Sequence, residues 1–473
     1  MLSSINPLNF INPYQHLLIF ADMKKLPVGQ PDFRQIIEGG YLYVDKTEWI
    51  FRLVTGSQFY FFPRPRRFGK SLLVSTLKEL FEGNKELFKG LWIYGQYDFK
   101  PHPVIVISFA RTDFRENSLA TALLNQLDRI AAALGLTLSG QTPKDKFQEL
   151  IEKAGKETPV AVLIDEYDKP ITDFMDNLPQ ANENREVLRN FFGILKDLSV
   201  APYLRFLFIT GISKFSKVSL FSELNQLKDL TLHPAFAGMV GITQPELEHH
   251  FADRIELLQA EFKVSKDALL AKIKFWYNGY SWDGKTWLYN PFSLLNFFDS
   301  KVFRGFWFAS GTPSMLVKIL KNRWELLEEM EEKNVNEAFF EKYEFDKIDL
   351  YSLMFQTGYL TIREVEEFPD DTWFTLGYPN NEVRNAFNQS LLEAFVNLPP
   401  SSTQHYLFKV QKALFDGNPA AFAPGLKPIF ADISYESLPK NHGNPAKLAA
   451  QLEGYYQTVT EIIVKFLGIN VQS

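Results

Sequence analysis

The sequence predicts an α/β fold in which helices cover both faces of a parallel sheet, followed by a mainly helical region. Four solid apolar runs are typical of strands that are buried on both faces. They are residues 59–62, 103–109, 160–164 and 204–210. Patterns with helical apolar spacing lie between them, at 119–134 and 144–156. Because strands that alternate with helices pair in parallel, this order predicts the doubly covered sheet.

The segment before the sheet is rich in turns. Residues 41–47 predict a short strand that ends in a helix N-cap, and residues 48–54 predict the helix. After the aromatic run at 59–62, a basic loop leads directly into apolar helical spacing over 72–81. The order at this point is therefore strand, loop, helix.

After about residue 241 the pattern changes to helices. Thr243 and Glu246 form a capping box that opens a helix over 244–254. The pair Thr312-Pro313 is another helix start, with threonine at the cap and proline at the first helical position. The acidic run 324–341 is expected to be a solvated helix face.

The last third of the chain is also mainly helical. Residues 345–365 predict a helix and then an alternating strand at 357–362, an order that resembles a winged-helix element. A further helical stretch begins at Asn381. Residues 419–445, rich in Pro, Gly and Asn, are expected to form a loop before a last helix over 445–467.

Length and composition limit the class of protein. A chain of 473 residues predicts roughly three units at the usual domain size. The net charge of −6 argues against a surface that binds nucleic acid or anionic membrane throughout, although local basic patches stay open. The chain has no cysteine and no apolar run of membrane-spanning length, so a cytoplasmic protein is expected. Residues 1–22 lack the pattern of a signal peptide and are expected to be a tail.

The basic loop after the aromatic strand carries half of a phosphate-binding motif. A P-loop reads G-x-x-x-x-G-K-[ST]: backbone N–H groups at a helix start wrap a phosphate, the lysine neutralises phosphate oxygens, and the hydroxyl binds Mg²⁺. Its second half is present, so the fold is expected to be of the P-loop NTPase type, with Lys70 also a catalytic candidate. The candidate nucleotide-binding residues are Arg66, Arg67, Phe68, Gly69, Lys70, Ser71 and Leu72.

The first glycine of the motif is replaced by Arg64. Because arginine takes a positive φ less readily than glycine, the loop is expected to turn differently at its start. The alternative is a chance Gly-Lys-Ser in a basic loop. The strand before it, the helix after it and an acidic pair downstream argue against chance. Which arginine of the loop, if any, stabilises charge in phosphoryl transfer stays open.

The acidic pair lies at the end of an apolar strand. Asp165 and Glu166 follow the run 160–164, and open α/β sheets place their ligands at this end of a strand. Hydrolysis needs one carboxylate to hold Mg²⁺ and a neighbour to polarise the attacking water. We assign Asp165, together with Ser71, to the metal and Glu166 to the general base. An acid cluster in a solvated loop is the alternative.

Three further features are open to two interpretations each. Asp168 belongs either to the surroundings of the metal or to the start of a helix. Thr210, at the end of the run 204–210, is either a catalytic sensor that hydrogen-bonds the γ-phosphate or water, or part of a strand-ending turn. The aromatic cluster at 276–289 either packs in the core or stacks on bases or a peptide.

Taken together, these motifs resemble the bacterial AAA-ATPase-like family. The matching blocks occur in order at 64–72, 163–168, 210–225, 276–280, 289–293, 309–313 and 355–360. The resemblance covers Lys24 to the end of the chain. It implies an ATPase in which arginine at the first glycine position is ordinary.

Members of that family commonly continue into a nuclease-like domain of the PD-(D/E)XK superfamily. Residues 455–473 are similar to its first helix, and the acidic strands that metal-dependent cleavage needs do not follow. Nuclease activity is therefore not expected of this chain. The expected parts are a tail at 1–22, an AAA-like P-loop ATPase domain at 23–241, a helical lid of winged-helix character at 242–380, and a helical linker with the truncated start of the nuclease-like domain at 381–473.

Two hypotheses of function remain. The first is ATP binding and Mg²⁺-dependent hydrolysis by a molecular switch, with ATP and Mg²⁺ as cofactors. The second is a nucleotide-gated interaction or DNA-binding module with negligible turnover, which controls a nuclease-like partner domain. DNA and a second copy of the chain stay open as partners, and no membrane is expected.

Overall fold

The computed structural model describes residues 23–214, 226–307, 332–340, 349–395 and 400–431, together with scattered positions such as Phe221 and Ile462. The expected tail at 1–22 and the helix start at Thr312-Pro313 lie outside the described residues. Half of the acidic run 324–341 and most of the expected last helix also lie outside them.

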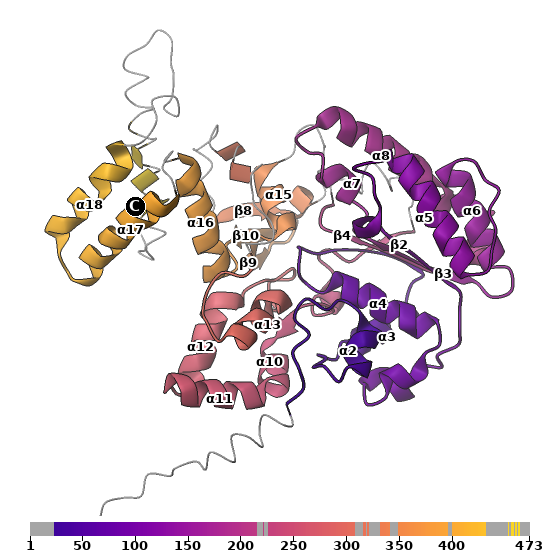
Figure 1. Cartoon of the computed structure of the whole chain (residues 1–473), viewed down its shortest axis with the longest axis horizontal. Coiled ribbons are helices and arrows are strands. Elements are labelled where there is room, and N and C mark those ends of the chain that lie inside the picture. Colours follow the sequence, from indigo (N-terminus) through magenta and orange to yellow (C-terminus); the bar gives the residue numbers. More distant parts are fainter. Residues whose placement is uncertain are drawn as a thin grey trace, which may run out of the picture.

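A five-stranded sheet forms the centre of the N-terminal half, and all of its strands are parallel (Figure 1). The strand order is β2-β3-β4-β1-β5. The strands are β1 (Phe59–Pro63), β2 (Val104–Ser108), β3 (Val160–Asp165), β4 (Leu204–Gly211) and β5 (Lys228–Asp229). The first four coincide with the apolar runs, and β5 was not predicted. The α/β fold is confirmed.

Helices cover both faces of this sheet (Figure 1). On one face lie α2 (Phe33–Glu38), α3 (Thr47–Thr55) and α4 (Lys70–Phe81). On the other lie α5 (Leu119–Ala133), α6 (Pro143–Ala154), α7 (Lys169–Thr172) and α8 (Leu178–Phe192). Short 3-10 turns occupy 85–88, 92–95, 109–111, 193–196, 201–203 and 234–236.

The expected strand at 41–47 is wrong. Only Tyr41 makes a bridge, with Lys25, and Thr47 is the first residue of α3 instead of its cap. The reason is local: the Asp45 carboxylate accepts hydrogen bonds from the Thr47 N–H at 2.8 Å and from its hydroxyl at 2.6 Å. This turn-like pairing competes with a strand ladder and starts the helix.

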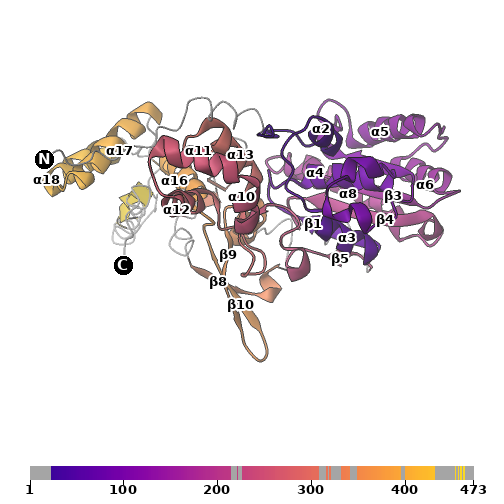
Figure 2. The same cartoon turned by 90° about the horizontal axis from the view of Figure 1, so that it is seen from below.

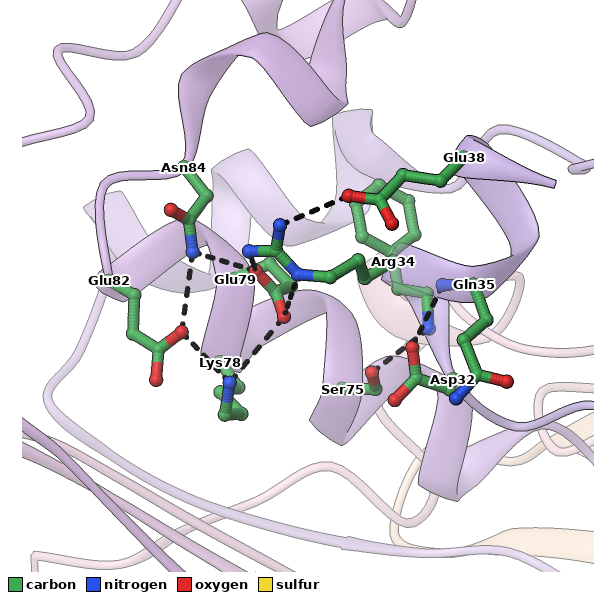
Figure 3. Close-up of polar contacts among 10 residues, drawn as sticks. Asp32, Arg34, Gln35, Glu38, Ser75, Lys78, Glu79, Glu82 and Asn84 are labelled. Carbon is green, nitrogen blue, oxygen red and sulfur yellow. Dashed lines mark hydrogen bonds and ion pairs between the residues drawn. The ribbon is translucent and has the colours of Figure 1, made fainter. Parts of the chain in front are cut away.

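Hydrogen bonds and an ion pair join helix α2 to α4, the helix that follows the basic loop (Figure 3). The Arg34 guanidinium forms a bidentate pair with Glu79 of α4, with Nη2 to Oε2 at 2.6 Å and Nε to Oε1 at 3.3 Å. Asn84 also donates to this carboxylate, at 2.7 Å. One turn away, the Phe33 N–H donates to Ser75 Oγ at 2.9 Å. These contacts hold α4 in place against the sheet.

The second half of the chain begins with four helices around a two-stranded ladder. They are α10 (Gln244–His250), α11 (Ala252–Phe262), α12 (Lys266–Tyr277) and α13 (Pro291–Ser300), with β6 (Ile242–Thr243) and β7 (Leu288–Tyr289). The capping box at α10 is confirmed, since the Glu246 carboxylate accepts the Thr243 N–H at 2.8 Å. The helix is shorter than predicted, because it ends at Phe251 and α11 starts anew.

A three-stranded antiparallel sheet with order β8-β10-β9 extends from this half (Figure 2). It contains β8 (Lys333–Asn336), which precedes α15 (Leu350–Thr357), and β9 (Thr361–Glu367) and β10 (Thr372–Gly377), which follow it. The expected strand at 357–362 therefore starts four residues late, because Gly358, with φ +89°, ends α15. The described part of the acidic run 324–341 is strand β8, paired with β10, followed by a short 3-10 helix at 337–340, and is not the expected α-helix.

The last described helices are α16 (Asn381–Phe395), α17 (Pro400–Phe415) and α18 (Pro419–Ala431). The start of α16 agrees with the sequence, whereas the expected loop from 419 is wrong over α18. Two prolines lie inside this helix, yet Leu426 and Ile429 are buried and Gly425 packs closely on Val410 of α17. Tertiary packing of an apolar face has overridden the local cost of proline.

Two hydrophobic cores organise the described residues. The larger one surrounds the five-stranded sheet and continues through Trp282 and Trp307 into α15, β9 and α16. The smaller one joins Leu42 to α10–α13. In the described part of the chain, no helix is long and apolar enough to cross a membrane.

Candidate functional site

The basic loop connects β1 to α4 at the carboxyl edge of the sheet. Two residues supply its left-handed turns: Arg67 has φ +68° and Gly69 has φ +89°. Gly69 also caps α4, and a Cβ added there would meet nothing within 4 Å, so only its backbone conformation favours glycine. The helix therefore begins with its N–H groups facing the loop, as a phosphate site requires.

Arg64, at the position of the first glycine, needs no positive φ and instead lies buried with 1% exposure. Its guanidinium is sandwiched between the rings of Phe62 at 4.4 Å and Trp282 at 4.2 Å. Nη1 donates to the carbonyls of Pro63 and Thr231. Burial lowers its pKa to about 9. The side chain thus joins the loop to distant parts of the fold.

Lys70 lies at the first position of α4 and is buried. Its Nζ donates to the carbonyls of Arg64 at 2.9 Å and Pro65 at 2.8 Å, so the ammonium closes over the loop. Burial lowers the pKa of Lys70, and the nearby Asp165 and Glu166 carboxylates oppose that shift. A phosphate in the loop would replace two neutral acceptors with charged ones.

Ser71 and Asp165 meet across the site. Ser71 Oγ donates to Asp165 Oδ2 at 2.7 Å, which joins α4 to the end of β3 across 94 positions of sequence. The other carboxylate oxygen, Oδ1, is buried and has no hydrogen-bond partner within the described part of the chain. Burial raises the pKa of Asp165, and the Ser71 hydrogen bond opposes the shift. An orphaned carboxylate oxygen beside a hydroxyl fits a Mg²⁺ ion, which takes oxygen ligands and needs few from protein.

Glu166, the residue after Asp165, has φ +54°. This left-handed conformation is uncommon for a residue with a Cβ. Strained backbone of this kind concentrates at functional sites. Its carboxylate is half-buried, and burial raises its pKa, with the Asp165 charge acting in the same direction. Such a shift brings a carboxylate toward the range in which it exchanges protons near neutral pH.

Asp168 has a function that neither interpretation of the sequence anticipated. It is 1% exposed, and although it precedes α7 its side chain does not cap that helix. Instead one oxygen accepts the N–H groups of Ile212 and Ser213 and the Ser213 hydroxyl, at 3.1, 2.7 and 2.6 Å. The carboxylate thereby fixes the loop after β4 against the loop after β3.

Thr210 lies inside the sheet, on β4. Its side chain is fully buried, and its hydroxyl donates to the Phe62 carbonyl of β1 at 2.6 Å. It lies on β4, between the strands that carry the loop and the acidic pair. Its assignment as a sensor stays a prediction.

Comparison with known proteins identifies the family. A family model described as predicted AAA-ATPase matches residues 27–221. An uncharacterized protein in the vnfD 5' region of Azotobacter chroococcum mcd 1 is 37% identical to this chain over 457 residues, 95% of this chain and 84% of that protein. The chain belongs to the predicted AAA-ATPase family. The resemblance seen in the motifs is thereby confirmed.

The remaining loop residues of this predicted AAA-ATPase face different surroundings. Arg66 and Arg67 are exposed, and the Arg67 guanidinium lies 4.5 Å from the Phe292 ring. Phe68 points away from solvent and packs edge-on against Tyr280 at 4.7 Å and Trp282 at 5.2 Å. Tyr280 and Trp282 belong to the aromatic cluster at 276–289. Because both are buried, they favour the interpretation that this part of the cluster packs in the core.

An apolar pocket of about 100 Å³ opens beside the loop of the predicted AAA-ATPase. Gly69 and Leu72 form one wall, and residues from α2 and the turn at 239–242 form others. Lys46 also lines it, and this lysine pairs with Glu246 at 2.6 Å. The volume of this pocket lies below the usual range for small-molecule sites. Sequence reasoning missed it because its walls are ordinary apolar residues from distant segments.

The second half of the predicted AAA-ATPase touches the loop at several points. Trp307 Nε1 donates to the Arg66 carbonyl at 3.2 Å. A Cβ on Gly358 would lie 2.8 Å from the Pro65 ring, so α15 ends against the loop. After β4, the Lys214 N–H donates to Gln356 at 2.6 Å. A change of shape in the loop would therefore reach α15 directly.

Proposed function

We propose that this chain binds ATP with Mg²⁺ and hydrolyses it, and that it acts as a molecular switch. The observation that carries the proposal is the 2.7 Å contact between Ser71 Oγ and Asp165 Oδ2. It joins a hydroxyl at a phosphate-binding helix start to a carboxylate at the end of the apolar strand β3. That combination is the one that nucleotide-dependent phosphoryl transfer requires.

Each residue has a distinct part in this proposal. Lys70 exchanges its two carbonyl partners for phosphate oxygens, and the backbone of 66–71 wraps the phosphates. Ser71 and Asp165 would hold Mg²⁺, which neutralises charge on the β- and γ-phosphates when bound. Glu166 accepts a proton from the attacking water, and its raised pKa suits that task.

The switch rests on the contacts that the second half of the chain makes with the loop. Arg64, Phe68 and the Arg66 carbonyl each pair with an aromatic residue beyond residue 279. Movement of the loop on nucleotide binding or phosphate release would have to move or break these pairs. The helical region would then differ between the two nucleotide states.

Steady-state release of phosphate from ATP tests the proposal. Lys70→Ala should abolish nucleotide binding, whereas Glu166→Gln should bind ATP and lower turnover roughly a hundredfold or more. Lys78→Ala, on the exposed side of the same helix, and Glu157→Gln, exposed before β3, are matched controls that should behave as wild type. Normal turnover by Lys70→Ala or Glu166→Gln would refute the assignment.

A nucleotide-gated interaction module with negligible turnover is the second candidate. The observation that favours it is the hydrogen bond from Thr210 to Phe62, because a sensor hydroxyl held inside the sheet contributes little to hydrolysis. Such a module would control a PD-(D/E)XK nuclease-like partner domain. It predicts tight ATP binding with phosphate release at the background rate, so clear turnover by the wild-type chain would exclude it.

Binding of DNA through the β9–β10 hairpin has less support. The hairpin carries Glu364, Glu366, Glu367, Asp370 and Asp371. Carboxylates repel the phosphate backbone that dominates DNA affinity. Contact with nucleic acid would have to use another surface.

A further inference from the structure

A cavity of about 470 Å³ lies in the second half of the molecule, apart from the phosphate loop. Its walls come from the end of α12, the end of β10 and the start of α16, with Arg363 of β9 at one side. No residue of the loop 63–72 lines it. Its volume falls within the usual range for small-molecule sites.

The cavity has a single sign of charge. Lys274, Arg363 and Arg384 line it, and no Asp or Glu is among its described lining residues. Arg363 is oriented by two backbone carbonyls, those of Tyr378 and Pro379, each 3.4 Å from Nη1. Arg384 Nη2 donates to Asn381 at 3.2 Å, while its Nε is buried without a hydrogen-bond partner in the described residues. The three cations therefore favour an anionic occupant.

The N-terminus of α16, a helix of 15 residues, opens into the same cavity. Asn380 precedes it, is 9% exposed, and accepts the Val383 N–H through Oδ1 at 3.1 Å. Its amide nitrogen Nδ2 is buried and has no partner among the described residues. A buried donor without an acceptor costs free energy, so the wall of the cavity contains one unsatisfied polar group.

Planar side chains complete the site. Trp287 lines the cavity, and the Arg363 guanidinium lies 5.7 Å from its ring. Phe275, also in the lining, is 57% exposed, which is unusual for so large an apolar side chain. Aromatic faces beside cations are the pattern with which proteins hold nucleobases next to phosphates.

From these observations we propose that this cavity binds a phosphorylated nucleoside, with its phosphate on Lys274, Arg363 and Arg384 and its base against Trp287 and Phe275. The source is either a free mononucleotide or one unit of a single nucleic-acid strand. The site is separate from the proposed ATP site. Gly279 lines the cavity and the next residue, Tyr280, packs on Phe68 of the phosphate loop.

Fluorescence anisotropy with a labelled thymidine hexanucleotide tests the site in the full chain. The parent chain and every variant carry Lys70→Ala, so that the phosphate loop does not bind the probe. Lys274→Glu should weaken binding roughly tenfold or more at low salt and reduce the salt slope by about 0.7, the value for one lost phosphate contact. Lys272→Glu is the matched control, because Lys272 is on the same helix but packs over Phe303, and it should bind as wild type.

The base contact has its own pair of variants. Phe275→Ala should weaken binding roughly 5- to 150-fold, the range for one stacked base. Phe368→Ala removes an equally exposed phenylalanine from outside the cavity and should have no effect. Competition then separates the sources: thymidine monophosphate competes as well as the hexanucleotide if a free mononucleotide is the ligand, and much more weakly if a strand is.

Three results would overturn the proposal. The first is wild-type affinity in Lys274→Glu and Phe275→Ala. The second is equal loss in Lys272→Glu or Phe368→Ala, which would indicate diffuse electrostatic binding. The third is competition by inorganic phosphate or a phosphotyrosine peptide that equals competition by the nucleotides, because the base would then contribute nothing.

Discussion

At the scale of single residues, the buried charges of this chain are the most informative. Lys70, Asp165 and Arg64 are each at least 93% buried, and each has a pKa shifted by burial. Folding does not favour isolated buried charge, and each group has polar partners: carbonyls for Arg64 and Lys70 and the Ser71 hydroxyl for Asp165. Asp165 Oδ1 and the Lys70 ammonium face the place where the proposed ATP phosphates would lie.

Glu382 is a buried charge outside that site, and it gives a testable pH dependence. It accepts the N–H groups of Phe306 and Trp307 through Oε1, and burial raises its pKa from 4.5 to about 7. The folded chain thus binds this proton more tightly than the unfolded chain. Stability should be full below about pH 4.5 and fall by up to about 3 kcal/mol as pH rises to about 7.

Urea unfolding across this pH range measures the effect. Glu382→Gln keeps the acceptor for both N–H groups and should make the slope between about pH 5 and pH 7 smaller. Glu393→Gln, on the same helix, should leave the slope unchanged. Identical slopes in wild type and Glu382→Gln would show that this carboxyl does not control it.

At the scale of elements, the short helix α2 supports the helix that carries Lys70 and Ser71. Its main anchor is the Glu79 carboxylate, whose side chain is 5% exposed and which accepts from Arg34 and Asn84 (Figure 3). The pair is partly screened because Arg34 is 40% exposed. Even so, loss of the carboxylate leaves the Arg34 and Asn84 donors without their acceptor on α4.

Glu79→Ala should therefore lower the free energy of unfolding by roughly 1–3 kcal/mol. Glu82→Ala is the control three residues further along, where an exposed pair with Lys78 contributes no more than about 0.5 kcal/mol. Chemical denaturation of both variants provides the comparison. A loss in Glu82→Ala as large as in Glu79→Ala would show that the contacts of Glu79 with Arg34 and Asn84 are not the main anchor.

The secondary-structure elements also show why some features could be predicted from the sequence. Strands β1–β4 and the run Gly69-Lys70-Ser71 depend on neighbours in sequence, and their patterns predicted them closely. The strand at 41–47 and the loop at 419–431 were wrong because an Asp45 side chain and tertiary packing decided those conformations. The contact between Asp45 and Thr47 is local and could have been predicted, whereas local patterns do not contain tertiary packing.

At the scale of the whole molecule, the candidate site depends on contacts across long stretches of chain. The Arg64 guanidinium reaches Thr231 and Trp282, and Trp307 reaches back to the loop. The pocket beside Gly69 is likewise assembled from separate segments, among them 42–50, 68–76, 239–242 and 291–295. No spacing in the sequence indicates such partners, so the motif was predictable and its surroundings were not.

The proposed function depends on Ser71 and Asp165 holding the Mg²⁺ that accompanies ATP. Calorimetric titration of ATP into wild type and Asp165→Asn, each with Mg²⁺ and with chelator, tests it most directly. Wild type should bind ATP more tightly with Mg²⁺ than with chelator, and Asp165→Asn should lose this difference. An Asp165→Asn variant that keeps the full Mg²⁺ dependence, or a wild-type chain that binds no ATP, would contradict it.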